Sequence, residues 1–174
     1  MKSCNEIIMT RRSVKGYDPD MMPSEEDIKA IIDAGLAAAS GRNMQAPIIV
    51  AVTNKEIRDR LSHANAAVMG AGGDPFYGAP CVLVVLASKE AHTYVYDGSL
   101  TLGNMMLAAH ERGLGSCWVH RAKEVFMQDE WQTWLREIGV EGDYEGIGNL
   151  TLGYPSGDYP AEKERKPGRV FYVK

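Results

Sequence analysis

Residues 93–119, TYVYDGSLTLGNMMLAAHERGLGSCWV, predict a helix, a glycine turn and a strand, in that order. Small residues and methionines occupy several sides of the helical part, up to about Arg112, which indicates a helix that is buried. Gly113 and Gly115 are expected to end it, because glycine readily adopts the conformations that close helices. A glycine-rich phosphate loop has the opposite order, with the strand before the glycines. We therefore expect a buried helix that leads directly into a strand.

The remaining elements follow from apolar periodicity and from helix-capping residues. Ser24 is placed to cap a helix that ends near Ser40, Asn54 can cap the next helix, and a polar helical segment extends through Ile138. Strands separated by helices predict an α/β or α+β sheet with helices on its faces. The predicted strands are residues 48–52, 81–87, 116–119, 147–152 and 169–173.

The last predicted strand, RVFYV at residues 169–173, is separated from the others by a segment rich in glycine, proline and charge. It could return to its own sheet or cross to a second subunit. Two-fold symmetric dimers are the commonest oligomers, so we expect a homodimer.

Length and composition indicate one cytoplasmic domain covering residues 1–174. The longest apolar run, residues 81–87, is far shorter than the ~18 residues that span a bilayer, and no apolar signal-peptide core is present at the N-terminus. A net charge of -4 argues against nucleic-acid binding. We expect neither a membrane partner nor a nucleic-acid partner.

The cysteines and histidines indicate neither a disulfide framework nor a metal site. The three cysteines are odd in number and have no CxxC spacing. The histidines at positions 63, 92 and 110 have no acidic or cysteine partner at metal-ligand spacing. We therefore expect no metal.

Cations are concentrated at both ends of this acidic chain. Arg11, Arg12 and Lys15 surround Ser13, and further cations follow at Lys163, Arg165, Lys166 and Arg169. Guanidinium groups match phosphate oxygens bidentately and a serine hydroxyl adds a hydrogen bond, so both ends could converge on one phosphate. The alternative is a pair of solvated basic loops.

Two further clusters have polar or nucleophilic side chains. ASGRNMQAP at residues 39–47 offers Asn43 and Gln45, whose amides could read the edge of a heterocyclic ring, although the same residues also suit a plain helix-ending turn. Cys117 and His120 could form a nucleophile and a base, but residues three apart on a strand point to opposite faces. A buried structural cysteine is the favoured interpretation. Asp97, within the buried helix, needs a partner or a solvent-facing turn.

In their order along the whole chain, these segments resemble the FMN-dependent nitroreductase family. The motifs that support the resemblance are RRSVKGYD at 11–18, ASGRNMQAP at 39–47, YGAPCVLVV at 77–85, YDGSLTLGNMMLAAHERGLGSCWV at 96–119 and LTLGYPSGDYPAEKERKP at 150–167. The resemblance implies an α+β three-layer sandwich whose mixed, mainly antiparallel sheet is flanked by helices. It also implies an intertwined homodimer with FMN at the interface and an exchanged C-terminal strand.

The resemblance also assigns FMN contacts to individual positions. Arg11 and Ser13 would hold the phosphate and ribityl chain beside Arg12, and Lys15 would reach the pyrimidine edge. The partner subunit would supply Ser40, Arg42, Asn43 and Gln45. Cys117, Trp118, Val119 and His120 would pass the reactive flavin face, and Lys163 and Arg165 would approach the phosphate.

This chain departs from the family pattern in three places. Ala39 stands where the family often has proline, and Ala46 separates Gln45 from Pro47. Val119, His120 and Arg121 replace an acid–glycine pair beside the flavin N5 atom, so a backbone N–H would supply that hydrogen bond. The helical insertion over the substrate channel is short, which leaves the channel open or capped by residues 70–77.

The function implied by the resemblance is that of an NAD(P)H-dependent flavin oxidoreductase without a catalytic side chain. FMN would accept a hydride at N5 from NAD(P)H and pass electrons to a small organic acceptor, such as a nitroaromatic or a quinone, in ping-pong order. Lys15 would stabilise the anionic reduced flavin. A non-catalytic flavin-binding or sensing module is the alternative. Dehalogenation or flavin fragmentation on the same scaffold, the acceptor, and NADH or NADPH preference stay open.

Overall fold

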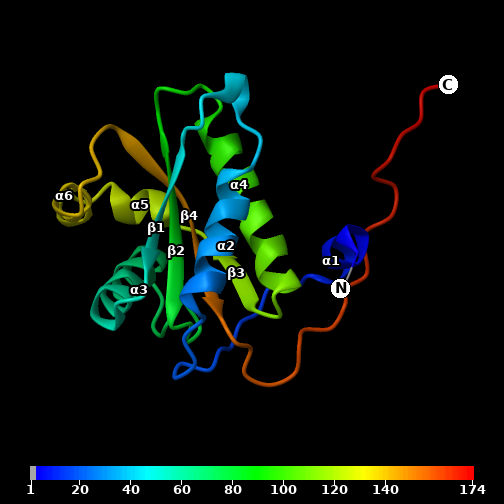
Figure 1. Cartoon of the computed structure of the whole chain (residues 1–174), viewed down its shortest axis with the longest axis horizontal. Coiled ribbons are helices and arrows are strands. Elements are labelled where there is room, and N and C mark those ends of the chain that lie inside the picture. The colour runs from blue at the N-terminus through cyan, green and yellow to red at the C-terminus, as the bar shows by residue number, and fades with distance from the viewer. Residues whose placement is uncertain (1–2) are drawn as a thin grey trace.

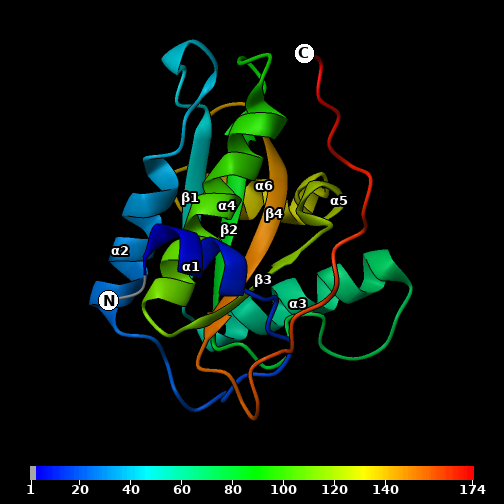
Figure 2. The same ribbon diagram turned by 90° about the vertical axis from the view of Figure 1, so that its right-hand side faces the viewer.

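A computed structural model describes residues 3–174, which form an antiparallel four-stranded sheet with helices on both faces (Figures 1 and 2). The expected α+β three-layer sandwich is confirmed. The strand order is β1-β2-β4-β3. The strands are β1 (Pro47–Val52), β2 (Cys81–Ser88), β3 (Gly115–Val119) and β4 (Tyr144–Gly153). The helices are α1 (Cys4–Thr10), α2 (Glu25–Leu36), the 3-10 turn η1 (Gly41–Asn43), α3 (Lys55–Met69), α4 (Tyr94–Glu111), α5 (Ala122–Phe126) and α6 (Asp129–Glu137).

The central strand β2 is buried on both faces, as its continuous apolar run predicts. Its side chains alternate between two cores. Leu83 and Val85 belong to the core beneath α2 and α4, whereas Val82 and Val84 belong to the core beneath α3, α5 and α6. The sheet is therefore the middle layer, with a separate core on each side.

The predicted caps and the buried helix are confirmed. The side chains of Ser24 and Asn54 accept hydrogen bonds from the backbone N–H groups of Asp27 and Ile57, at 3.1 and 3.0 Å. Helix α4 spans Tyr94–Glu111 and packs against both α2 and the sheet. Its close approach needs small residues, because a Cβ at position 98 would clash with Ile147.

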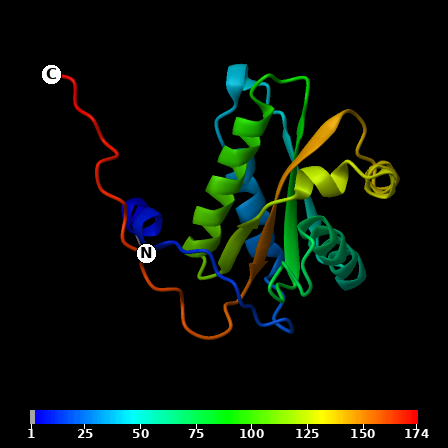
Figure 3. The same cartoon turned by 180° about the vertical axis from the view of Figure 1, so that it is seen from behind.

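Three predicted boundaries differ from the structure. Helix α2 ends at Leu36 rather than near Ser40, because the chain must turn into a loop of left-handed residues. The polar helix divides into α5 and α6 at Gln128, whose backbone is extended. Residues 169–173, expected to be a strand, form none within residues 3–174, so of the two alternatives the return to their own sheet is not the one observed. Figure 3 shows why: this arm runs past α1 and away from the sheet edge.

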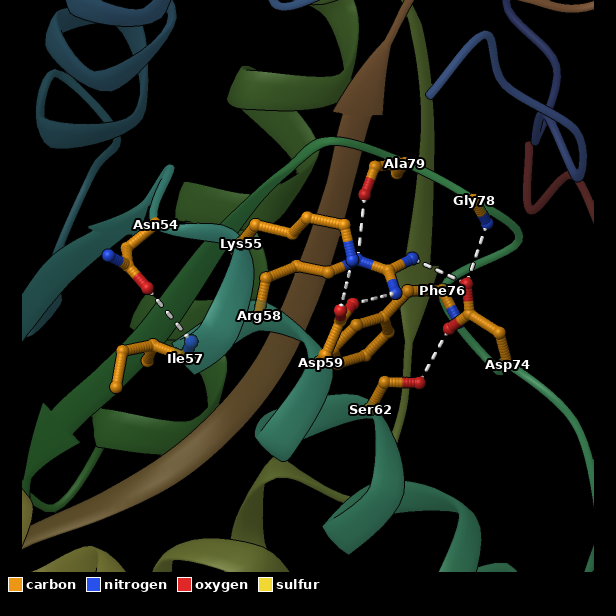
Figure 4. Close-up of polar contacts among 10 residues, drawn as sticks. All are labelled: Asn54, Lys55, Ile57, Arg58, Asp59, Ser62, Asp74, Phe76, Gly78 and Ala79. Atoms are coloured by element: carbon orange, nitrogen blue, oxygen red, sulfur yellow. Dashed lines mark hydrogen bonds and ion pairs between the residues drawn. The ribbon is translucent and has the colours of Figure 1, made fainter. Parts of the chain in front are cut away.

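The loop between α3 and β2 is held by ion pairs between the buried Arg58 side chain and two partly exposed aspartates (Figure 4). Arg58 donates to the carbonyl oxygen of Ala79 at 2.8 Å and forms ion pairs with Asp59 and Asp74. Partial burial works to raise the pKa of Asp74, but hydrogen bonds from Arg58 and Ser62 hold that pKa below its ordinary value. Asp74 also accepts hydrogen bonds from the backbone N–H groups of Phe76 and Gly78.

No helix within residues 3–174 has both the length and the apolar character needed to cross a membrane. The location in the cytoplasm stays a prediction.

Candidate functional site

The first wall of the candidate site is the N-terminal segment 11–17, which lies along β3. The backbone N–H of Val14 donates to the carbonyl oxygen of Ser116 at 3.0 Å, and Ser13 forms a parallel bridge with Ser116. The buried Tyr17 hydroxyl lies 3.0 Å from the Val14 carbonyl oxygen and 2.8 Å from the Thr151 hydroxyl. Burial raises the pKa of Tyr17 well above its ordinary value, so this hydroxyl stays protonated. The cation-bearing segment is therefore anchored in the core.

The second wall is the C-terminal segment 154–165, which leaves β4 and runs antiparallel to the first wall. A Cβ at position 16 would meet the Ser156 side chain, so the two walls pass closely there. The hydrogen bonds that join them are Asp18 N–H to the Tyr154 carbonyl oxygen (3.0 Å), Ser156 N–H to the Gly16 carbonyl oxygen (3.0 Å) and Arg12 N–H to the Tyr159 hydroxyl oxygen (2.8 Å).

Between the two walls lies a cleft of about 590 Å³, lined by residues 11–16 from one wall and residues within 155–165 from the other. The structure thus brings together cations that are about 150 residues apart in the sequence, as the phosphate hypothesis requires. The charged residues that line the cleft are Arg11, Arg12, Lys15, Asp158, Lys163 and Arg165. The excess of cations makes the cleft suitable for an anion.

Buried donors in this region lack partners among the described residues. They are Nη1 of Arg11 and Nε of Arg12. Arg12 is otherwise bonded, since its Nη1 donates to the carbonyl oxygen of Met9 at 2.7 Å and its Nη2 lies 3.4 Å from Glu162. A buried donor without an acceptor costs free energy that a bound anion would recover. The donor set of the cleft therefore fits a phosphate group.

Cys117 lies beneath the first wall and is buried. Desolvation raises the pKa of its thiol, even though a hydrogen bond from Ser13 and the charges of Lys15 and Arg11 act in the opposite direction. The thiol is therefore protonated and poorly nucleophilic, as expected for a structural cysteine. His120 is exposed and follows β3, and Asn65 binds its carbonyl oxygen at 3.1 Å. Trp118 is half-buried and Val119 is buried.

Lys15 marks one end of the cleft. Its Nζ lies 5.8 Å from the centroid of the Tyr77 ring, within the range of a cation–π contact. Tyr77 has a positive φ of 56° and directly precedes Gly78, which is bonded to Asp74. The ion-paired loop after α3 thus places an aromatic ring against Lys15.

The segment containing Ser40, Arg42, Asn43 and Gln45 lies outside the cleft lining, at the opposite end of α4 from α1 (Figure 1). Arg42, Asn43 and Gln45 all have positive φ values, of 52°, 55° and 48°. Such left-handed conformations are costly for these residues and persist only where the surroundings impose them.

Asp97 is the residue that holds this strained loop. Its carboxylate accepts hydrogen bonds from the Gly41 N–H at 3.1 Å and from the Thr93 hydroxyl at 3.0 Å. Gly41 is required because a Cβ there would clash with Thr93. The buried carboxylate that the sequence left without a partner therefore fixes the start of the 40–45 loop.

Sequence reasoning missed Tyr159 and His110. Tyr159 bonds to the first wall, and its ring stacks on the buried His110 with centroids 5.3 Å apart. His110 was considered only as a metal ligand, and Tyr159 only as part of a turn. No local pattern signals the contact, because the two residues are 49 positions apart.

The fold and the cleft define a three-layer α+β protein with a cation-lined site suited to a phosphorylated ligand. Residues 8–154 match the model of the nitroreductase family. The chain belongs to this family, as the sequence motifs predicted.

Relatives and solved structures agree with this assignment. An NADH dehydrogenase/NAD(P)H nitroreductase of Archaeoglobus fulgidus is 30% identical, over 100% of this chain and 99% of the relative. A nitroreductase from Bacteroides fragilis, solved with bound FMN, has a TM-score of 0.87 and 28% identity, with 100% of each chain covered. A Desulfitobacterium hafniense nitroreductase with bound FMN has the same TM-score and coverage at 25% identity.

Proposed function

We propose that this chain is an FMN-dependent oxidoreductase that uses NAD(P)H. The observation that supports this most strongly is the cleft between the two walls, where buried guanidinium nitrogens lack an acceptor among the described residues. Family membership and the FMN-bound nitroreductases of the same fold support FMN as the ligand.

Different residues of the cleft would contact different parts of the cofactor. Arg11 and Ser13 would hold the phosphate and ribityl chain from the anchored wall, and Lys163 and Arg165 would approach the phosphate from the other. Lys15 would place its ammonium group near the pyrimidine edge of the ring, where a positive charge stabilises the reduced, anionic form.

The segment 117–120 would border the reactive face of the ring. Cys117, Trp118 and Val119 lie in β3, and a backbone N–H between Val119 and Arg121 would bond to the flavin N5 atom. The chemistry that FMN supplies when bound is hydride acceptance at N5 from NAD(P)H, followed by electron transfer to a small organic acceptor such as a nitroaromatic or a quinone, in ping-pong order.

A second copy of the chain would complete the site. The loop with Ser40, Arg42, Asn43 and Gln45 lies outside this chain's own cleft, so it is available to the cleft of a partner. The C-terminal arm exposes its apolar residues, including Phe171 at 87% and Tyr172 at 83% exposure. Such side chains are expected to pair with another subunit, because an exposed apolar strand is otherwise an aggregation hazard. We therefore propose a homodimer with an exchanged strand at residues 169–173.

Anaerobic reduction tests the proposed activity. Purified protein reconstituted with FMN should be yellow and should lose its colour when NADH or NADPH is added. Protein that stays yellow would instead be a non-catalytic flavin module. Failure to bind FMN would contradict both functions. If Lys15→Met left the FMN reduction potential and the hydride-transfer rate unchanged, the role of Lys15 would be wrong.

A further inference from the structure

The two walls of the cleft are attached to the protein in different ways. Segment 11–17 is tied to β3 and to the buried hydroxyls of Tyr17 and Thr151. Segment 158–165, which contains Lys163 and Arg165, is exposed along most of its length. Its cations can act on a phosphate in the cleft only if the segment is held against the first wall. Tyr159 is placed to do this.

Tyr159 connects the second wall to three parts of the molecule. Its hydroxyl oxygen accepts a hydrogen bond from the Arg12 backbone N–H at 2.8 Å. The same hydroxyl lies 3.1 Å from Nδ1 of His110, in the last turn of α4, and the two rings are stacked. His110 is only 7% exposed, and its Nε2 lies 2.8 Å from the Thr10 hydroxyl, at the end of α1.

The hydroxyls of Thr10 and Tyr159 each have more than one polar neighbour. The Thr10 hydroxyl donates its one hydrogen to the Glu6 carbonyl oxygen at 2.6 Å, so the N–H of His110 Nε2 donates to Thr10. The Tyr159 oxygen accepts from the Arg12 N–H, and its hydroxyl lies 3.1 Å from Nδ1 of His110 and 3.4 Å from the Arg12 carbonyl oxygen. The Tyr159 hydroxyl is therefore held by contacts both to the first wall and to α4.

We propose that Tyr159 and His110 form a clasp that positions the second wall and thereby preorganises the phosphate end of the cofactor site. This proposal rests on the proposed function. Tyr159 joins Arg12 of the first wall to the segment that contains Lys163 and Arg165, and neither Tyr159 nor His110 lines the cleft, so Tyr159 is a positioning residue and not a phosphate ligand. A ligand that finds both walls in place does not have to order the segment on binding, which saves conformational entropy.

The test is the affinity of Tyr159→Phe apoprotein for FMN and for riboflavin, which differs from FMN by lacking the phosphate. The variant keeps the ring that stacks on His110 and removes only the hydroxyl. FMN should bind about 3- to 10-fold more weakly, the scale of one or two lost hydrogen bonds, whereas riboflavin affinity should stay within about 2-fold. Tyr144→Phe, on the other side of the sheet, is the matched control and should change neither affinity.

A double-mutant cycle separates positioning from general destabilisation. Lys163 is on the positioned wall, so the FMN losses of Tyr159→Phe and Lys163→Gln should combine to less than their product. Arg11 is on the anchored wall, so Tyr159→Phe and Arg11→Gln should multiply. Equal losses for FMN and riboflavin, or independent effects of Tyr159 and Lys163, would overturn the clasp. Normal FMN affinity in Tyr159→Phe but not in Arg11→Gln would refute the clasp alone, and normal affinity in both would refute the cofactor site as well.

Discussion

Two clusters in this chain, Arg58 with Asp59 and Asp74 and the pair Arg11 and Arg12, differ in how their buried guanidinium nitrogens are partnered. Arg58 is nearly buried, and each of its three nitrogen groups has an acceptor: the Ala79 carbonyl oxygen, Asp59 and Asp74 (Figure 4). Arg11 and Arg12 also have buried guanidinium nitrogens, but Nη1 of one and Nε of the other lack an acceptor among residues 3–174. The Arg58 cluster is complete, because the chain supplies acceptors for its buried donors. The Arg11–Arg12 cluster is incomplete, because two of its buried donors lack them.

The difference separates a structural cation from a binding cation. Charge density in the sequence does not distinguish them, because paired and unpaired arginines look alike there. The distinguishing feature is whether the protein supplies acceptors for the buried donors. The complete cluster should therefore contribute to the stability of the apoprotein, and the incomplete one to ligand affinity.

Asp74→Ala should have the largest effect, because it leaves Arg58 buried without its main counter-ion. We expect a loss of about 2–4 kcal/mol in the free energy of unfolding, measured by urea denaturation of the apoprotein. Asp59→Ala is the matched control. It also contacts Arg58 and is about as exposed as Asp74. It accepts none of the hydrogen bonds from Ser62, Phe76 and Gly78 that Asp74 accepts, so its loss should cost less than about 1 kcal/mol. Equal losses in the two variants would show that these additional hydrogen bonds of Asp74 do not stabilise the fold.

Arg11→Gln should show the reverse behaviour. FMN affinity should fall about 10- to 100-fold, the scale of a lost charge-assisted contact to phosphate, as measured by fluorescence titration of the apoprotein. The free energy of unfolding should change by less than about 0.5 kcal/mol. Arg60→Gln, an exposed arginine paired with Glu130, is the control and should leave FMN affinity unchanged. A large loss of stability in Arg11→Gln would show that the Arg11–Arg12 cluster also stabilises the fold.

The pH dependence of stability gives a third, smaller effect. The pKa of Asp74 is lower in the folded protein than in the unfolded chain, so its stabilising contribution is present above about pH 4 and is lost as pH falls through the folded pKa. Urea unfolding between about pH 5 and pH 3 should show a decline that is shallower in Asp74→Asn than in the wild type. If stability declined equally with falling pH in both proteins, Asp74 would not be the group responsible for the loss.

The smallest effect is expected at Asp158, an acidic residue among the cations that line the cleft. Asp158→Asn should tighten FMN binding by about 2-fold at low salt, and the gain should shrink as salt screens the exposed charge. Weaker binding in this variant would mean that the carboxylate itself contacts the ligand.

Local patterns predicted most of the fold. The apolar run of β2, the small-residue surface of α4 and the caps at Ser24 and Asn54 each depend on neighbouring residues, and all are confirmed. The end of α2 at Leu36, the break at Gln128 and the course of residues 169–173 depend on packing and on sheet edges, which a single sequence does not reveal.

Part of the candidate site was predictable from the sequence and part was not. Cations at both ends suggested a shared anion, and the cleft between the two walls brings them together. The Tyr159–His110 contact and the Asp97 bond to Gly41 join positions 49 and 56 residues apart, through side chains with no recurring spacing. Only the structure shows which buried donors are left without acceptors.

The most direct test of the account is the affinity of the wild-type apoprotein for FMN and for riboflavin, measured side by side by calorimetry. A cleft that binds phosphate through unpaired guanidinium groups should bind FMN at least about 10-fold more tightly, since each charge-assisted contact contributes roughly 1.5–3 kcal/mol. Equal affinity for the two flavins would contradict the central claim that the buried donors of Arg11 and Arg12 are there to hold a phosphate.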